Sequence, residues 1–119
     1  MIAIRKIVLA SAVLTFCCDA AFPQGAGFVT LSARLAPNGT VGFGSGVQSA
    51  VRSSVGVYVV TFTRSVANCN FLATRQANTP GEIVTAPIVG NPNVVRVRTY
   101  NSAGAPQDSG VSLMVNCAS

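Results

Sequence analysis

The sequence predicts an all-β fold: a small antiparallel β-sandwich, or a jelly-roll-like barrel, of seven to eight strands with one disulfide. Short apolar runs alternate with Gly, Pro, Asn and Ser along most of the chain, which is the pattern of strands separated by turns. No segment carries a helical period of useful length. Because parallel strands are joined by long crossovers, usually helices, we expect the strands to be antiparallel.

Turn residues divide the chain into eight expected strands. They cover residues 27–36, 40–46, 47–53, 56–64, 69–74, 83–89, 94–100 and 111–117. The clearest is GVYVVTFTR, because all of its residues except Gly56 and Arg64 are β-branched or aromatic. Tyr58, Val60 and Phe62 fall on one face of this strand.

Proline, asparagine and glycine set the boundaries between these strands. The PNG triplet at 37–39 is typical of a tight hairpin turn, and the glycines of 40–46 favour a softened strand or a bulge there. We expect loops or turns at 76–82, 90–93 and 101–110. Pro87 lacks an N–H, which limits the strand at 83–89 to a sheet edge or ends it early.

The first 20 residues have the pattern of a secretory signal peptide. Arg5 and Lys6 precede an apolar stretch at 7–18, and small residues allow cleavage after Ala20 or Ala21. A membrane-spanning helix needs roughly 20 apolar residues, so we expect no membrane span. The expected organisation is therefore a signal peptide at 1–20, a flexible lead-in at 21–26 and a β-sandwich domain at 27–119.

Two other interpretations of the leader remain open. Cys17 or Cys18 is the lipidated first residue if the leader is a lipoprotein signal, although the large Phe16 fits that pattern poorly. The third interpretation is an uncleaved, buried N-terminal helix. We expect simple export, to the periplasm or the medium, with Cys17 and Cys18 discarded.

The composition argues against catalysis. Residues 21–119 contain six arginines, no lysine, Glu82 and Asp108, which gives a formal net charge of +4. The whole chain has no histidine, so the commonest general base and metal ligand is missing. Two carboxylates in separate polar loops do not make a hydrolase pair. We therefore expect no catalytic residue, no metal site, no cofactor and no enzyme activity.

Cys69 and Cys117 are the thiols that remain after the leader is removed. Cys69 is in register with the inward face of 69–74, and Cys117 with that of 111–117. Paired cysteines usually bond in an oxidising compartment, and a ring of about 48 residues contributes on the order of 4 kcal/mol. We expect a disulfide that ties the last strand to the strand at 69–74. Two separate buried thiols are the alternative.

The arginines of the strand at 94–100 are the one candidate binding patch. Arg96 and Arg98 share a face, and guanidinium groups suit carboxylate and phosphate. Without a basic run and with few aromatic stacking platforms, we expect no nucleic-acid binding. A solvated face is the simplest interpretation of these residues. The alternative is a patch for an anionic ligand formed by Arg96, Arg98 and Tyr100.

Two long segments carry a family resemblance. GSGVQSAVRSSVGVYVVTFTRSVANCNFLAT and NPNVVRVRTYNSAGAPQDSGVSLMVNC resemble a small exported bacterial β-domain of unknown function, which occurs in secreted and tail-fibre-like surface proteins. The shared pattern is a GVYxVxF strand, a cysteine, a VxVxT[YF]N strand and a terminal cysteine, over about residues 44–117. The resemblance implies an exported β-sandwich and no particular activity.

Together these observations predict a secreted, non-catalytic β-sandwich module that acts by surface contact. Its partner would be an unknown protein, an envelope component or glycan, or a second copy of itself, because strand edges with few charges do little to discourage pairing. The alternative is an extracellular carbohydrate-binding module for anionic glycans.

Overall fold

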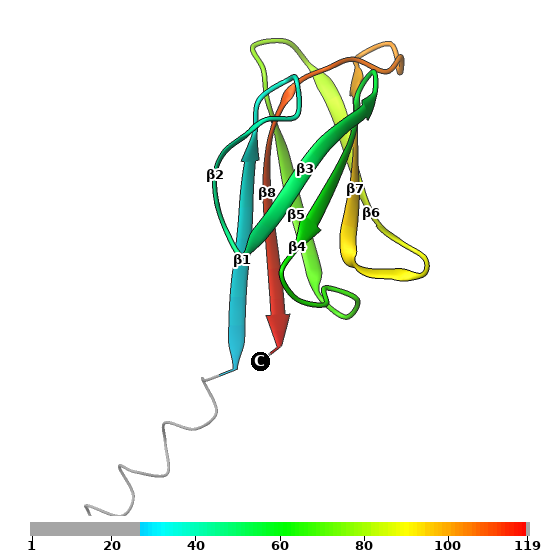
Figure 1. The fold of residues 1–119 in the computed structure, drawn as a ribbon. Coiled ribbons are helices and arrows are strands. Elements are labelled where there is room, and N and C mark those ends of the chain that lie inside the picture. The colour runs from blue at the N-terminus through cyan, green and yellow to red at the C-terminus, as the bar shows by residue number, and fades with distance from the viewer. Residues whose placement is uncertain (1–26, 119) are drawn as a thin grey trace, which may run out of the picture.

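The computed structural model describes residues 27–118, which form two antiparallel sheets packed face to face (Figure 1). The strands are β1 (Phe28–Leu35), β2 (Val41–Ser45), β3 (Val47–Ser54), β4 (Val57–Phe62), β5 (Asn70–Gln76), β6 (Gly81–Ile88), β7 (Asn91–Asn101) and β8 (Gly110–Ala118). Sheet A has the order β2-β1-β8-β5, and sheet B has the order β3-β4-β7-β6. The described residues contain no helix. The predicted all-β antiparallel sandwich is confirmed.

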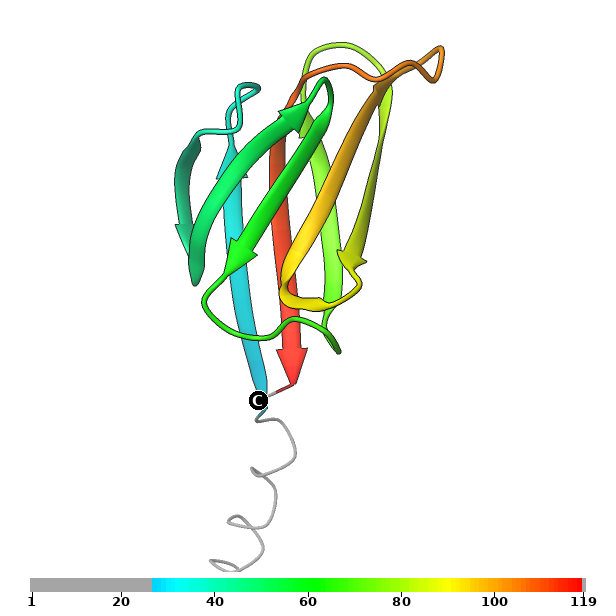
Figure 2. The ribbon, with the colours of Figure 1, turned by 45° about the vertical axis from the view of Figure 1, so that its right-hand side comes forward.

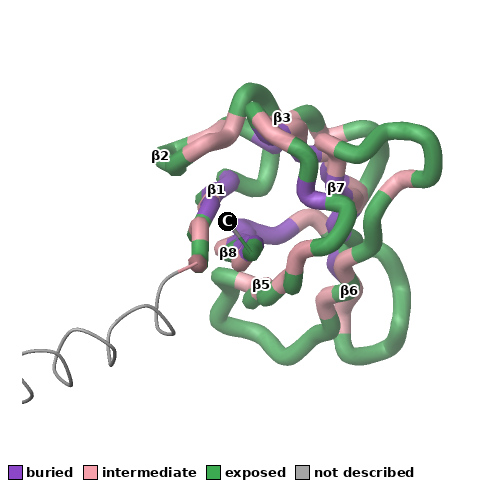
Figure 3. Tube along the Cα trace, turned by 90° about the horizontal axis from the view of Figure 1, so that it is seen from below, coloured by how far each residue is buried: buried purple, intermediate pink, exposed green. Residues whose placement is uncertain are grey.

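The hydrophobic core lies between the sheets and is built from alternate residues of the strands. In sheet A, Leu31 lies opposite Val115, and in sheet B, Val60 lies opposite Val95. All four side chains are buried. Figure 3 shows the same arrangement along the strands, with buried segments on β1, β8 and β7 and exposed segments in the outer loops. The sandwich therefore has one inner face per sheet, which leaves the other face of each sheet to solvent.

The alternation expected from the sequence is confirmed strand by strand. The predicted inward faces of β4, β7 and β8 are buried at Tyr58, Val60, Phe62, Val95, Val97, Thr99, Val111, Leu113, Val115 and Cys117. Arg96 and Arg98 lie on the opposite face of β7, in half-buried and exposed positions. The alternation predicted for these three strands therefore places the listed side chains on the correct face of each strand.

The chain crosses between the sheets at four connections, and Figure 2 shows the strands that they join in a view turned from that of Figure 1. The first crossing, from β2 to β3, turns at Gly46, where φ is +74°. A Cβ at this position would clash with Cδ2 of Leu31. The glycines predicted to soften residues 40–46 thus form a short strand and the corner between two sheets, and the ladder to β1 shifts register between Arg34 and Leu35.

Two strand boundaries differ from the prediction. The turn expected at 90–93 is made by Val89 and Gly90, and the Asn91–Asn93 stretch already belongs to β7. The loop expected at 76–82 is shorter, because β6 begins at Gly81. Pro87 lies in β6, at the edge of sheet B, and this prediction is confirmed.

The predicted disulfide is confirmed. Cys69 directly precedes β5, Cys117 lies in β8, and their sulfurs are 2.06 Å apart. The two strands are neighbours in sheet A, with Asn70 opposite Asn116. The bridge therefore ties the last strand of the chain to β5.

Both ends of the described segment lie at one end of the sandwich. β1 is paired with β8 over its whole length, with Phe28 opposite Ala118 (Figure 1). The predicted signal peptide at 1–20, the lead-in at 21–26, and Cys17 and Cys18 lie outside the described residues. Within residues 27–118 there is no helix with the length and apolar character needed to cross a membrane.

Candidate binding surfaces

The predicted anionic-ligand residues lie on the outer face of β7, which is an interior strand of sheet B. Arg98 is exposed, and Arg96 and Tyr100 are half-buried. The side chains of these three residues alternate with the buried Val97 and Thr99, so the extended backbone places them on one side of the sheet. The structure therefore brings the predicted patch together along one strand.

A small hollow of about 70 Å³ adjoins the two arginines. It is lined by Val84, Ala86, Arg96 and Arg98. In the ladder between β6 and β7, Val84 lies opposite Arg98 and Ala86 opposite Arg96. Because the β6 side chains are short, they leave room beside the guanidinium groups.

The charges near this hollow favour an anion. Within residues 27–118, the salt bridge joins Arg52 to Asp108, so neither Arg96 nor Arg98 has a carboxylate partner there. Glu82 lies opposite Tyr100, one outward pair along the ladder from Val84 and Arg98, and forms no salt bridge with either arginine. Planar donors of this kind can hold a carboxylate, sulfate or phosphate group by paired hydrogen bonds.

The outer face of sheet A carries a second candidate surface, which is not among the sequence predictions. Phe28 is exposed there at the start of β1, at 78%, and three further large apolar side chains lie together: Phe43 from β2 at 63%, Leu72 from β5 at 59% and Met114 from β8 at 44%. Exposed apolar side chains scattered singly are normal, whereas a cluster on one face marks a contact site. The sequence does carry a sign of this surface. Leu72 and Met114 are large apolar residues at positions of their strands that alternate with the inward ones and therefore face outward.

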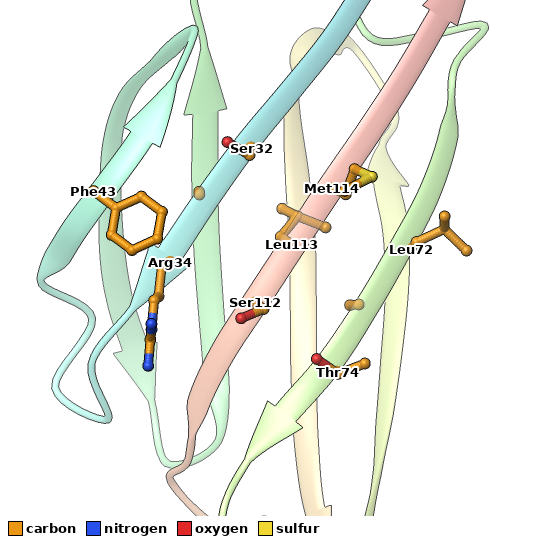
Figure 4. A pocket seen from close by; sticks show the side chains of 10 residues that line it. Ser32, Arg34, Phe43, Leu72, Thr74, Ser112, Leu113 and Met114 are labelled. Carbon is orange, nitrogen blue, oxygen red and sulfur yellow. The ribbon is translucent and has the colours of Figure 1, made fainter.

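Phe43, Leu72 and Met114 surround a hollow of about 360 Å³ (Figure 4). Phe43 lies on the β2 side, Leu72 lies on the β5 side, and the small side chains of Ser32 and Ser112 lie between them. The Arg34 guanidinium carbon is 5.7 Å from the centre of the Phe43 ring, within the range of a cation–π contact. The result is an apolar depression with a projecting aromatic ring at one margin.

Asp108 lies in a hydrogen-bonded cluster at the end of the sandwich opposite Phe28 and Ala118. Its carboxylate accepts two hydrogen bonds from Nε of Arg52, each 2.9 Å, and one from the Gly56 N–H at 2.7 Å. Next to it, the buried Tyr58 hydroxyl donates to the Pro37 carbonyl oxygen and accepts from the Ser109 N–H. These contacts fasten the 102–109 loop to the β3–β4 hairpin and to the turn after β1.

The cluster shifts the pKa values of its members in directions that follow from these contacts. Hydrogen bonds from Arg52 and then from the Gly56 N–H lower the pKa of the Asp108 carboxyl below its ordinary value of 3.8. The hydrogen bond to Asp108 raises the pKa of Arg52, and burial raises that of Tyr58. Asp108 is thus held ionised as a structural anion.

The contact between Asp108 and Arg52 is not among the sequence predictions, which place Asp108 and Glu82 in separate polar loops. The hydrogen bonds of the Tyr58 hydroxyl could have been anticipated, because Tyr58 lies on the predicted inward face of its strand. A buried tyrosine usually finds a hydrogen-bond partner for its hydroxyl. Within the described part of the chain, no three His, Cys, Asp or Glu side chains gather in a metal-binding group.

Comparisons with known proteins do not assign the chain to a family. No family model matches the sequence, and no curated protein or solved structure matches it significantly.

Proposed function

We propose that the chain is an exported, non-catalytic β-sandwich module that acts by surface contact with another macromolecule. The observation that carries this proposal is the gathering of Phe43, Leu72 and Met114 on the outer face of sheet A. Covering such a face removes apolar area from water, which is the main driving force of protein association.

Two further observations support the exported and non-catalytic parts of the proposal. The leader pattern at 1–20 and the Cys69–Cys117 bridge both fit an oxidising compartment. The chain has no histidine, and the Asp108 carboxylate is engaged by Arg52 and Gly56. A group that already accepts three hydrogen bonds at a lowered pKa is a poor general base.

Photo-crosslinking in the producing cell tests the surface contact. A photoreactive amino acid replaces Leu72, and the matched control replaces Val51, which is equally exposed at 59% but belongs to sheet B. We expect adducts of higher mass from position 72 and not from position 51. No adduct at position 72, or equal adducts at both positions, overturns the proposal.

Fractionation and intact mass test export in the same cells. We expect the protein outside the cytosol, with a mass that corresponds to cleavage after Ala20 or Ala21 and to loss of two hydrogens at Cys69 and Cys117. Recovery from the cytosol with free thiols overturns this part of the proposal. An added lipid mass would assign the anchor to Cys17 or Cys18.

A second candidate function is a carbohydrate-binding module for anionic glycans, and the hollow between Val84, Ala86, Arg96 and Arg98 favours it. At about 70 Å³ it suits an anionic substituent rather than a whole sugar ring. The test is a glycan array with sulfated and uronic-acid glycans at low and high salt. Binding that disappears at high salt and in Arg96→Gln/Arg98→Gln, but not in Arg64→Gln, supports this function. Equal binding by all three proteins contradicts it.

A further inference from the structure

The outer face of sheet A differs from the rest of the described surface in its charge. Residues 27–118 carry a formal net charge of +4, yet Arg34 is the one charged side chain among the outward positions of β1, β2, β5 and β8. Its guanidinium lies over Phe43. Two identical molecules of net positive charge repel each other least through the face with the fewest charges.

The side chains of this face match those of interface cores. Such cores are enriched in aromatic residues and Met and depleted of charged residues. Here the hollow is lined by the aromatic Phe43, by Met114 and by the uncharged, apolar Leu72. Several of the polar side chains already bond to one another across the strands. Thr30 donates to Asn116 at 2.9 Å, and Gln76 donates to Ser112 at 2.6 Å. Covering these groups leaves fewer of them unsatisfied, which lowers the cost of removing water.

The face carries both an exposed aromatic ring and a hollow. It carries a projecting ring, Phe43, and beside it a hollow whose centre is formed by the small side chains of Ser32 and Ser112 (Figure 4). A two-fold axis places the same patch on both partners, so each must supply both a projection and a recess. This face supplies both.

The size of the face indicates a weak, reversible pair. Four strands at a spacing of about 4.8 Å and a β1 length of about 26 Å give a flat area of at most roughly 500 Å², because β2 is shorter than β1. A standard interface buries about 800 Å² of accessible surface per partner. Before side-chain relief is counted the face is therefore smaller than a standard interface, and we expect a dimer that dissociates on dilution.

We infer that a second copy of this chain covers the outer face of sheet A, with Phe43 of each copy in the hollow of the other. This inference rests on the proposed function, that the module acts by surface contact, and it names both the surface and the partner. The opposite sheet keeps Arg96 and Arg98 on the outside of such a pair.

Sedimentation velocity of the protein purified in its exported, oxidised form tests the inference. Over a dilution series from about 1 mM to about 1 μM, we expect a mass of two chains at the high end that falls toward one chain. We expect Leu72→Glu to weaken the association more than about tenfold, because a two-fold interface contains the change twice. We expect Val51→Glu to associate like the wild type. Raising the salt concentration should not weaken the pair, since its contacts are apolar.

Three outcomes overturn the inference: a single-chain mass at every concentration, equal weakening by Leu72→Glu and Val51→Glu, or dissociation by salt. Near-ultraviolet circular dichroism checks that the variants are folded, and Ser32→Arg, which fills the hollow from an outward position, replaces Leu72→Glu if that variant is not. Crosslinked adducts at position 72 whose mass is not a multiple of this chain would keep the proposed function while overturning self-association.

Discussion

Nε of Arg52 donates to both carboxylate oxygens of Asp108, at 2.9 Å in each case, and so joins β3 to the loop that precedes β8. Asp108 also accepts the Gly56 N–H. Since protonation neutralises Asp108, removes its ion pair with Arg52 and weakens its hydrogen bonds, the fastening of the loop depends on pH.

We expect Asp108 to give the protein an acid-sensitive part of its stability. Its folded-state pKa lies below the ordinary value of 3.8, so its contribution is present above that value and is lost as pH falls through the lower, folded-state pKa. Denaturant unfolding at a series of pH values from 7 to about 2 measures this. Asp108→Asn is expected to be less stable at neutral pH and to lose less stability on acidification. A parallel pH dependence in both proteins would contradict the expectation.

The Tyr58 hydroxyl is expected to stabilise the fold. Tyr58→Phe removes the partner of the Pro37 carbonyl at 2.7 Å and of the Ser109 N–H at 3.0 Å. Ser109 is buried, and leaving a buried group unpaired costs about 1–3 kcal/mol. The free energy of unfolding in denaturant measures the loss. Tyr100→Phe, at a half-buried position on the outer face of β7, is the control and should change it by less than about 0.5 kcal/mol.

The disulfide is expected to supply a large share of the stability. Cys69 and Cys117 are separated by 48 residues. A bridge that closes a ring of that size lowers the conformational entropy of the unfolded chain, which stabilises the fold by about 4 kcal/mol. Unfolding of the oxidised protein is compared with that of the reduced protein and of Cys69→Ser/Cys117→Ser. Agreement between the two bridge-free forms separates loss of the bridge from side effects of substitution. Equal stability of all three would contradict the expectation.

The corner at Gly46 is expected to be intolerant of a side chain. Gly46 and Gly90 both have positive φ, at +74° and +86°, but a Cβ would approach Leu31 only at Gly46 and would meet nothing within 4 Å at Gly90. Gly90→Ala should therefore lower the free energy of unfolding only by the cost of a left-handed backbone at a non-glycine residue, about 1–2 kcal/mol. Gly46→Ala should cost more, since Leu31 in the core must move as well. A smaller loss at Gly46 than at Gly90, in thermal or denaturant unfolding, would contradict this account.

The strands could be predicted because hydrophobic alternation is a local property. Tyr58, Val60 and Phe62 repeat every second residue, and all three are buried. The same parity placed Cys117 inward and indicated its pairing with Cys69, which the structure confirms.

Other features depend on contacts between distant segments and could not be predicted in the same way. The Asn and Pro residues at 91–93 suggested a turn, yet the Val66 N–H donates to the Pro92 carbonyl and these residues extend β7. The hollow of sheet A needs β2 and β5 on opposite sides of β1 and β8. No local pattern encodes that order, so Phe43 and Leu72 could not be recognised as members of one surface.

The pairing of Phe28 with Ala118 has a consequence for how the sandwich is held. A linker attached before β1 or after β8 joins the sandwich at the same end. The opposite end, with the Asp108 cluster, points away from the point of attachment. Tandem copies stacked end to end in one orientation would need linkers that run back along the full height of each unit, whereas copies placed side by side, or one unit inserted into a loop of a host protein, would need only a short spacer.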